Sequence, residues 1–162
     1  MVLIGLGSNL DSPRYGSPSH ILSAALSELE RRGLGVARRS SWYRSEPVPP
    51  SGQPWFINAA AILETELGAA DLLDVLQSVE TQFGRVRSAP NAARMLDLDL
   101  LDHDGEVVAT PALTLPHPRL HLRRFVLLPL AEIAPSWRHP RLGLGAAALL
   151  AQLATAERVE RL

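Results

Sequence analysis

One alternating stretch of the sequence reads Met95-Leu96-Asp97-Leu98-Asp99-Leu100-Leu101. Successive side chains of a β-strand point to opposite faces, so this alternation predicts a strand with one buried and one open face. The leucines at 96, 98 and 100 would then face the core. Asp97 and Asp99 would lie together on the open face, about 6 to 7 Å apart along the backbone. The stretch therefore predicts both a sheet and a place where two carboxylates stand side by side.

The chain before this strand carries the signals of further strands and helices. Its apolar runs and turn residues predict, in order, a strand at 2–7, a helix that begins at Pro18 and is stopped by Gly33, a strand at 35–45, a strand at 55–65 and a helix through 72–83 that Gly84 ends. Together with 95–101 the order is βαββαβ, which is typical of an antiparallel ferredoxin-like sheet with helices on one face. We therefore predict an α+β fold.

The chain after this strand is expected to add a hairpin and C-terminal helices. Asp104-Gly105 is a strong turn signal, so 106–109 would pair back on the strand. Helical segments are expected at 120–133 and 143–154. Pro129 should kink or end the first of these segments.

Composition restricts the chemistry and the partners. The chain of 162 residues has 16 basic side chains, all of them arginine, and no cysteine. The lack of lysine excludes Schiff bases and a Walker-type phosphate lysine, and the lack of cysteine excludes thiolate zinc sites and fits the cytoplasm. A net charge of −1 argues against a nucleic-acid partner, and we expect neither a membrane span nor a signal peptide. No repeat or linker interrupts 1–162, which we interpret as a single domain.

The paired aspartates are the most informative feature for function. Two carboxylates this close repel each other, and two divalent cations about 3.5 to 4 Å apart could be shared by the pair. Arg85, Arg87 and Arg94 precede the strand and could bind phosphate oxygens bidentately beside such a site. Alternatively, the aspartates are ordinary solvent-facing acids, and the arginines form surface ion pairs with them and with Glu80.

Several further stretches, taken with the acidic strand, carry a family resemblance. They read Gly5-Leu6-Gly7-Ser8-Asn9-Leu10, Ser41-Trp42-Tyr43-Arg44-Ser45-Glu46-Pro47, Gln53-Pro54-Trp55-Phe56-Ile57-Asn58-Ala59-Ala60, Gly84-Arg85-Val86-Arg87, Leu115-Pro116-His117-Pro118-Arg119 and the run from Arg123 to Pro135, with Gln77 and Glu80 between them. In this order, over nearly the whole chain, the sequence resembles the 6-hydroxymethyl-7,8-dihydropterin pyrophosphokinase family of folate biosynthesis.

The resemblance implies transfer of pyrophosphate from MgATP to the hydroxymethyl oxygen of the dihydropterin, leaving AMP. It implies that Asp97 and Asp99 hold two Mg²⁺ ions and that Arg85 and Arg94 contact the phosphates as catalytic residues. His117 would donate a hydrogen bond to the phosphate chain, although a polar turn residue between two prolines is the alternative. No general base is assigned, because positioning and electrostatics would supply the catalysis.

The resemblance also implies a pterin pocket. Phe56 and Phe125 would sandwich the ring, while Asn58 and backbone groups of Ser45 and Val48 would bind its polar edge. A flat bicycle with an amide edge needs such aromatic faces and paired donors and acceptors. Strand alternation puts Phe56 and Asn58 on the same face, as a shared pocket requires. Without the resemblance, a plain core role for both phenylalanines stays open as the alternative.

The expected nucleotide-binding residues are Gln77, Glu80, Arg87, Leu100, Thr114, His117 and Arg123. Gln77 and Glu80 have helical i, i+3 spacing, which also fits a solvated helix face. The expected partners are the small molecules ATP and 6-hydroxymethyl-7,8-dihydropterin, with no nucleic acid and no membrane. The protein is expected to be a monomer.

Two other functions stay open from the residues alone. RNA-recognition domains share the βαββαβ order and bind bases on strand aromatics, but the two aspartates would repel phosphate there. A metal-dependent phosphoryl or nucleotidyl transferase with another acceptor would use the same aspartates and arginines. Only the pterin pocket distinguishes that alternative.

Overall fold

A computed structural model describes residues 1–85, 92–154 and 157–162. Its elements are β1 (Val2–Ser8), α1 (Pro18–Arg31), β2 (Gly35–Arg39), β3 (Tyr43–Ser45), β4 (Phe56–Glu64), α2 (Ala69–Gln82), β5 (Asp97–His103), β6 (Val108–Ala109), β7 (Thr114–Leu115), the 3-10 helix η1 (Leu120–Leu122), α3 (Arg124–Ile133), α4 (Ala146–Gln152) and β8 (Val159–Arg161). The predicted α+β class is confirmed. Among the described helices, none is long and apolar enough to cross a membrane.

The main sheet is antiparallel and has β1 near its centre. Its order is β5-β1-β4-β3-β8, and β2 also pairs with β4, beyond β3 along that strand. The predicted strand at 35–45 is therefore two strands. Between them, the Ser40 backbone N–H donates to the Ala60 carbonyl at 2.9 Å, but the Ala60 N–H donates to the Ser40 hydroxyl at 3.0 Å and not to a backbone carbonyl. The acidic strand forms β5 as expected, and Leu98 and Leu100 are buried on one face of it.

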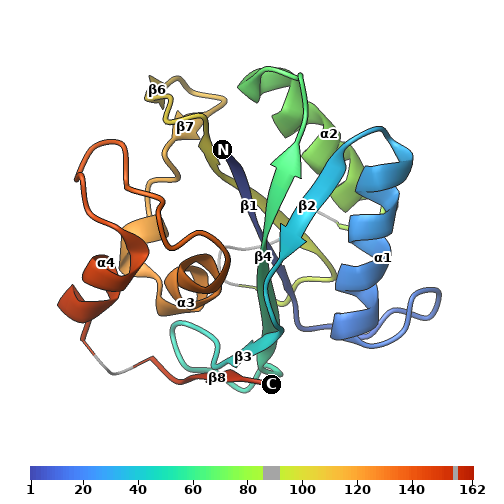
Figure 1. Cartoon of the computed structure of the whole chain (residues 1–162). Coiled ribbons are helices and arrows are strands. Elements are labelled where there is room, and N and C mark those ends of the chain that lie inside the picture. The colour runs from blue at the N-terminus through green and yellow to red at the C-terminus, as the bar shows by residue number, and fades with distance from the viewer. Residues whose placement is uncertain (86–91, 155–156) are drawn as a thin grey trace.

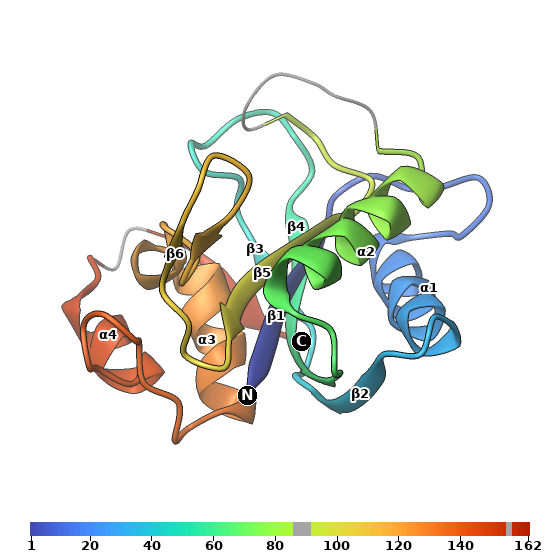
Figure 2. The same ribbon diagram turned by 90° about the horizontal axis from the view of Figure 1, so that it is seen from above.

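Helices cover both faces of the sheet, so the prediction of one covered face was wrong. Figures 1 and 2 show α1 and α2 on one side and α3 and α4 on the other. The reason is the apolar content of α3, whose buried residues include Val126, Leu127 and Leu130. These side chains pack with Leu3 and Leu101 into a second core, on the face opposite to the α1 and α2 core.

The predicted hairpin on β5 was also wrong. Asp104 and Gly105 do turn the chain, and Gly105 donates its backbone N–H to Asp102 Oδ1 at 2.8 Å. However, β6 pairs with β7 and not with β5. The turn that closes this pair lies between Thr110 and Leu113, where Thr110 donates its backbone N–H to the Leu113 carbonyl at 3.0 Å.

Pro129 neither ends nor divides its helix. Helix α3 runs from Arg124 to Ile133 with Pro129 buried inside it. A proline in this position removes one backbone hydrogen bond. Packing of the apolar helix against the second core offsets that loss, which is why the sequence signal for a helix end failed here.

Candidate active site

A cleft of about 520 Å³ opens at one end of the sheet, on the face covered by α3. The strand register forms its floor. Gly7 of β1 pairs with Asp97 of β5 on one side and with Asn58 of β4 on the other, and Gly5 pairs with Asp99 in the same way. The two glycines leave the floor open between the acidic side chains and the amide of Asn58.

Gly7 is the position where this close approach matters most. A Cβ atom at Gly7 would lie 3.1 Å from Asn58 Nδ2 and 3.9 Å from the Cβ of Asp97. The first of these distances is shorter than ordinary van der Waals contact, so any other residue would displace the Asn58 amide. The glycine therefore allows Asn58 to lie flat on the floor of the cleft.

Asp97 and Asp99 both line the cleft and are half-buried. Burial raises the pKa of both carboxyls, and the charge of Asp99 raises the pKa of Asp97 further, while Arg85, Arg94 and Arg123 act in the opposite direction. A divalent cation would replace the lost hydration and cancel the repulsion. The described residues contain no group of three or more His, Cys, Asp or Glu gathered as a metal site. A pair of carboxylates suits Mg²⁺, an ion that takes few protein carboxylates and completes its shell with water and phosphate oxygens.

Arg85 forms the ion pairs that the sequence left as an alternative. Its Nη1 donates to Asp97 Oδ1 at 3.0 Å and to Glu80 Oε2. The backbone N–H of Leu98 donates to the same Glu80 oxygen at 2.8 Å. Glu80 is buried between α2 and β5, and burial raises its pKa to about 7. Glu80 therefore holds Arg85 against the acidic pair.

Arg94 lines the cleft next to the acidic pair, and Asn9 fixes its backbone. Arg94 donates its backbone N–H to Asn9 Oδ1 at 2.8 Å, and the Asn9 N–H donates to the Arg94 carbonyl at 3.0 Å. The Asn9 amide also donates to the Pro54 carbonyl at 3.0 Å. Asn9 thereby joins the segment before β5 to the segment before β4.

The residues expected to bind pterin come together at the other side of the cleft. Ser45, Val48, Phe56, Asn58 and Phe125 all line it. The Ser45 hydroxyl donates to Asn58 Oδ1 at 2.5 Å, which fixes the orientation of the Asn58 side chain. The Arg123 guanidinium lies 5.5 Å from the centre of the Phe125 ring. Side chains from β3, β4 and the start of α3 thus form one half of the cleft.

Only some of the expected nucleotide-binding residues reach the cleft. Arg123 lines it. Gln77 and Thr114 are exposed elsewhere, and the Leu100 side chain belongs to the α1 and α2 core, so only its backbone is free to meet a ligand. Arg87 lies outside the described residues.

His117 is not among the residues that line the cleft, but it lies beside β5. Its backbone N–H donates to the Leu101 carbonyl at 2.9 Å, and its Nδ1 accepts a hydrogen bond from the Arg119 backbone at 3.1 Å. Burial, together with Arg123 and Arg119, lowers its pKa to about 4. The ring is therefore neutral at pH 7 with its proton on Nε2, which leaves Nε2–H as a donor.

Sequence reasoning missed several lining residues. Gly5, Gly7, Arg119 and Glu157 all line the cleft. The two glycines alternate on β1 opposite a predicted acidic strand, and that signal was available. Glu157 gave no local signal, because only the folded chain brings the C-terminal segment to the cleft.

Comparisons with known proteins identify the family of this chain. Residues 3–135 match the protein family described as 7,8-dihydro-6-hydroxymethylpterin-pyrophosphokinase. The chain is 42% identical over 142 residues to a 2-amino-4-hydroxy-6-hydroxymethyldihydropteridine pyrophosphokinase of Synechocystis sp., covering 87% of this chain and 70% of the relative. The enzyme of the same name from Haemophilus influenzae is 44% identical over 131 residues, covering 81% of this chain and 79% of that one. A folic acid synthesis protein of Pneumocystis carinii is 35% identical over 90% of this chain, which corresponds to 19% of its own length.

Proposed function

The chain belongs to the 7,8-dihydro-6-hydroxymethylpterin-pyrophosphokinase family, and we propose that the cleft between β5 and α3 is where it carries out the family reaction. The protein is an ATP-dependent pyrophosphokinase of folate biosynthesis. It transfers the pyrophosphoryl group of ATP to the hydroxymethyl oxygen of 6-hydroxymethyl-7,8-dihydropterin. A bond forms between that oxygen and the β-phosphorus, the bond from the β-phosphorus to the α-bridging oxygen breaks, AMP leaves and the hydroxyl proton is released.

One observation supports this location above all others. The cleft joins an acidic side, with Asp97 and Asp99, to an aromatic and amide side, with Phe56, Asn58 and Phe125. The first suits a metal-bound polyphosphate, and the second suits a flat heterocycle with an amide edge. A transferase for these two substrates needs both sides within one cavity, so that the acceptor oxygen is in line with the β-phosphorus.

Asp97 and Asp99 would hold two Mg²⁺ ions. The fit rests on two carboxylates of one strand face whose pKa values are raised by burial and, for Asp97, by repulsion from Asp99. Bound there, Mg²⁺ would neutralise charge on the phosphates during transfer. The role of the aspartates is to fix the ions at the floor of the cleft, where β1 has only glycine beside them.

Arginines and a histidine would bind the phosphates directly. The Arg85 guanidinium is held beside Asp97 by Glu80 before substrate arrives, and Asn9 holds the backbone of Arg94 at the cleft. Such preorganised donors stabilise charge on the transferring group. His117 would donate through Nε2–H as a neutral ring.

The pterin would lie between Phe56 and Phe125 with its amide edge on Asn58. Ser45 already orients the Asn58 side chain, so the pocket does not have to order it on binding. Backbone groups of Ser45 and Val48, which line the same side, would complete the hydrogen bonds.

The other nucleotide contacts, those of Gln77, Glu80, Arg87, Leu100, Thr114 and Arg123, stay predictions. Arg123 has the strongest support, since it lines the cleft. Glu80 would act through Arg85, because its carboxylate is buried beneath β5.

We also propose that the whole chain forms one domain with a ferredoxin-like core. The support is the β5-β1-β4 order with β2 and β3 beyond β4, and the two helices that connect β1 to β2 and β4 to β5. We expect a cytoplasmic monomer that acts on small molecules rather than on nucleic acid or at a membrane.

A product assay with ATP, Mg²⁺ and 6-hydroxymethyl-7,8-dihydropterin tests the reaction and the site together. AMP should form in step with a pyrophosphorylated pterin, and Asn58→Ala should need more pterin for the same rate. ADP as the nucleotide product would indicate an ordinary kinase. AMP that forms only with another acceptor would indicate a different transferase.

A further inference from the structure

The C-terminal segment 157–162 returns to the cleft and joins the sheet. Strand β8 pairs antiparallel with β3, placing Val159 opposite Ser45. The pairing continues at both ends, since the Glu46 backbone N–H donates to the Arg158 carbonyl at 3.0 Å and the Leu162 N–H donates to the Trp42 carbonyl at 2.9 Å. We call residues 157–162 the clasp. The clasp therefore pairs along the whole length of β3, the strand that carries Ser45.

Glu157, the first residue of the clasp, connects this strand to a different wall of the cleft. Its carboxylate Oε2 accepts a hydrogen bond from the Arg124 backbone N–H at 2.9 Å, and the residue itself lines the cleft. Arg124 is the first residue of α3, and the residue before it provides no side-chain cap. A carboxylate at this position satisfies an otherwise unpaired N–H and interacts well with the helix dipole.

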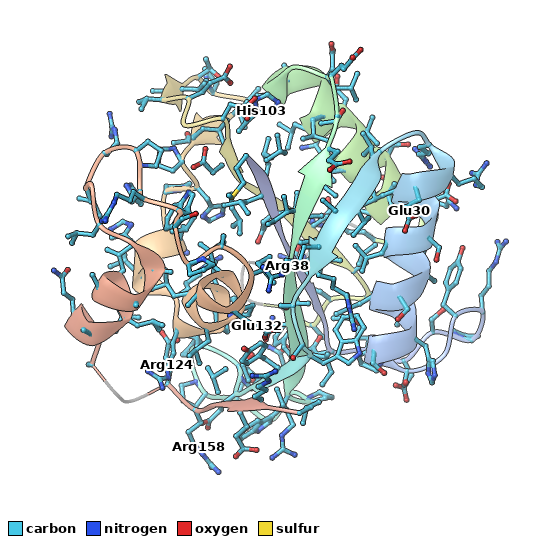
Figure 3. All side chains as sticks on the ribbon, viewed as in Figure 1. Glu30, Arg38, His103, Arg124, Glu132 and Arg158 are labelled. Carbon is cyan, nitrogen blue, oxygen red and sulfur yellow. The ribbon has the colours of Figure 1, made fainter. Side chains whose placement is uncertain are left out.

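The opposite end of α3 is fastened separately. Glu132 accepts a hydrogen bond from the Tyr43 hydroxyl at 2.7 Å and from the Ser41 backbone N–H at 2.9 Å. Figure 3 labels Glu132 on α3 and shows Arg124 and Arg158 in the lower part of the same view, toward the clasp. Glu132 therefore fixes where α3 lies on the sheet, and Glu157 fixes where α3 begins.

We propose that Glu157 is a positioning residue for pterin binding. It acts by holding the first turn of α3 against the β3 side of the cleft. This inference rests on the proposed function of the cleft. The clasp lies beyond residue 135, where the match to the family model ends.

The physical reason lies in the shape of the pterin slot. Phe125 follows Arg124 directly and forms one aromatic wall, whereas Ser45 and Phe56 pair with each other across β3 and β4. Stacking on a flat ring requires a fixed separation between such walls. Without the Glu157 bond, the first turn of α3 is freer, and pterin must order it on binding.

The test compares Glu157→Ala and Glu157→Gln with Glu160→Gln as a matched control. Glu160 is an exposed glutamate of the same clasp that pairs with Arg44 at 2.7 Å. Pterin binding is measured by calorimetry in the presence of a non-hydrolysable ATP analogue, with turnover and melting temperature measured alongside. We expect Glu157→Ala to raise the pterin Kd about three- to tenfold, as for loss of a helix cap, with turnover at saturation changed less than twofold. Glu157→Gln should restore most of the affinity, because an amide oxygen accepts the same N–H, and Glu160→Gln should bind like the wild type.

A second pair of variants tests the donor in case Glu157→Ala fails to fold. Arg124→Pro removes the N–H at the first helical position, where proline is tolerated, and the preceding Arg123 is already extended with φ −115° and ψ 109°. It should raise the pterin Kd as Glu157→Ala does, while Arg124→Ala, which keeps the N–H, should not.

Two results would overturn the inference. One is wild-type pterin affinity in Glu157→Ala or in Arg124→Pro. The other is an equal loss of affinity in the Gln and Ala variants of Glu157, which would show that the hydrogen bond is not what matters. A wild-type protein that binds no pterin and forms no AMP would refute the proposed function instead, so the two failures are distinguishable.

Discussion

The two faces of the sheet use the same strands in opposite ways. On the face under α1 and α2, β1 and β5 contribute Ile4, Leu6, Leu98 and Leu100, each at most 4% exposed. On the other face, at the end near α3, the residues next to these in sequence are Gly5, Gly7, Asp97 and Asp99. The first face carries large apolar side chains. The second carries glycines, which leave space, and carboxylates beside them.

This difference shows how a short strand can serve stability and binding at once. Because side chains alternate along a strand, neighbouring residues face the core and the cleft in turn. The same short strand can therefore contribute to both without additional residues. If this division holds, substitutions at adjacent positions of β5 should separate the free energy of unfolding from the rate of the reaction.

The largest effect is expected on turnover, from Asp97→Asn or Asp99→Asn. Each change should lower turnover about 10²- to 10³-fold, because it removes a charge that would hold metal against the transferring group. The fold should persist, since loss of one of two repelling carboxylates whose pKa values are raised by burial does not destabilise the metal-free protein. Turnover over a range of Mg²⁺ concentrations and the melting temperature are measured for both variants.

Either of two outcomes would contradict this division of roles between the two faces. Near-normal turnover at ordinary Mg²⁺ would remove that aspartate from the metal site. A variant that unfolds would show that the open face also holds the structure.

Leu98→Ala, one residue away, should have the opposite profile. Leu98 is 4% exposed in the core under α1 and α2, so its truncation should lower the free energy of unfolding by about 2 to 4 kcal/mol. Turnover per folded molecule should stay within a fewfold of the wild type, because the side chain faces away from the cleft. Urea unfolding provides the first quantity, and a rate corrected for the folded fraction provides the second. A collapse of turnover in the fully folded variant would mean that the two faces are coupled.

Residues 95–101 also show how much of the fold the sequence could predict. Alternation is a local property of the chain, so β5 and its two faces were predictable, as were α1, α2 and the α+β class. The partner of 106–109 was not, because a turn at Asp104-Gly105 does not by itself decide which strand the chain then pairs with, and the partner here is β7. Pro129 was misleading for a similar reason, since the packing that offsets it comes from residues far away in the sequence.

For the site, the predictable part is the part that lies on strands. Phe56, Asn58, Asp97 and Asp99 line one cleft as expected, because strand period and the family resemblance specify their faces. Glu80 was expected near the nucleotide, but helical spacing alone cannot show that its carboxylate reaches under β5 to Leu98. The contact of Glu157 with Arg124 joins residues distant in sequence, and no local pattern signals it.

Asn58→Ala changes the amide side of the cleft. We expect its effect, a loss of pterin affinity, to be smaller than the two effects above. The substitution should weaken pterin binding by about 1 to 2 kcal/mol, because it leaves the polar edge of the ring without its partner. ATP binding should be nearly unchanged, since the residues proposed to bind the phosphates are on β5 and the segment before it. Calorimetry with each ligand separately measures both. Equal losses for the two ligands would make Asn58 a structural anchor for Ser45 and Gly7 and not a pterin ligand.

The smallest expected effect is on the pH dependence of the free energy of unfolding, and it concerns Glu80, which is buried between α2 and β5. Burial raises its pKa from the ordinary value of 4.5 to about 7, so between these values the folded protein binds more protons than the unfolded chain. The resulting stabilisation is fully present below about pH 4.5 and is lost as the pH rises through 7. Glu80→Gln cannot ionise but keeps an acceptor for the Leu98 N–H, so its free energy of unfolding should fall less between pH 5 and pH 6, by about 1 kcal/mol. Urea unfolding without Mg²⁺ would measure this difference, with Asp97 and Asp99, whose charges also raise the pKa of Glu80, present in both proteins. Parallel pH profiles would instead mean that Arg85 keeps Glu80 ionised throughout, and that the charge network of the cleft extends through β5 into the packed face.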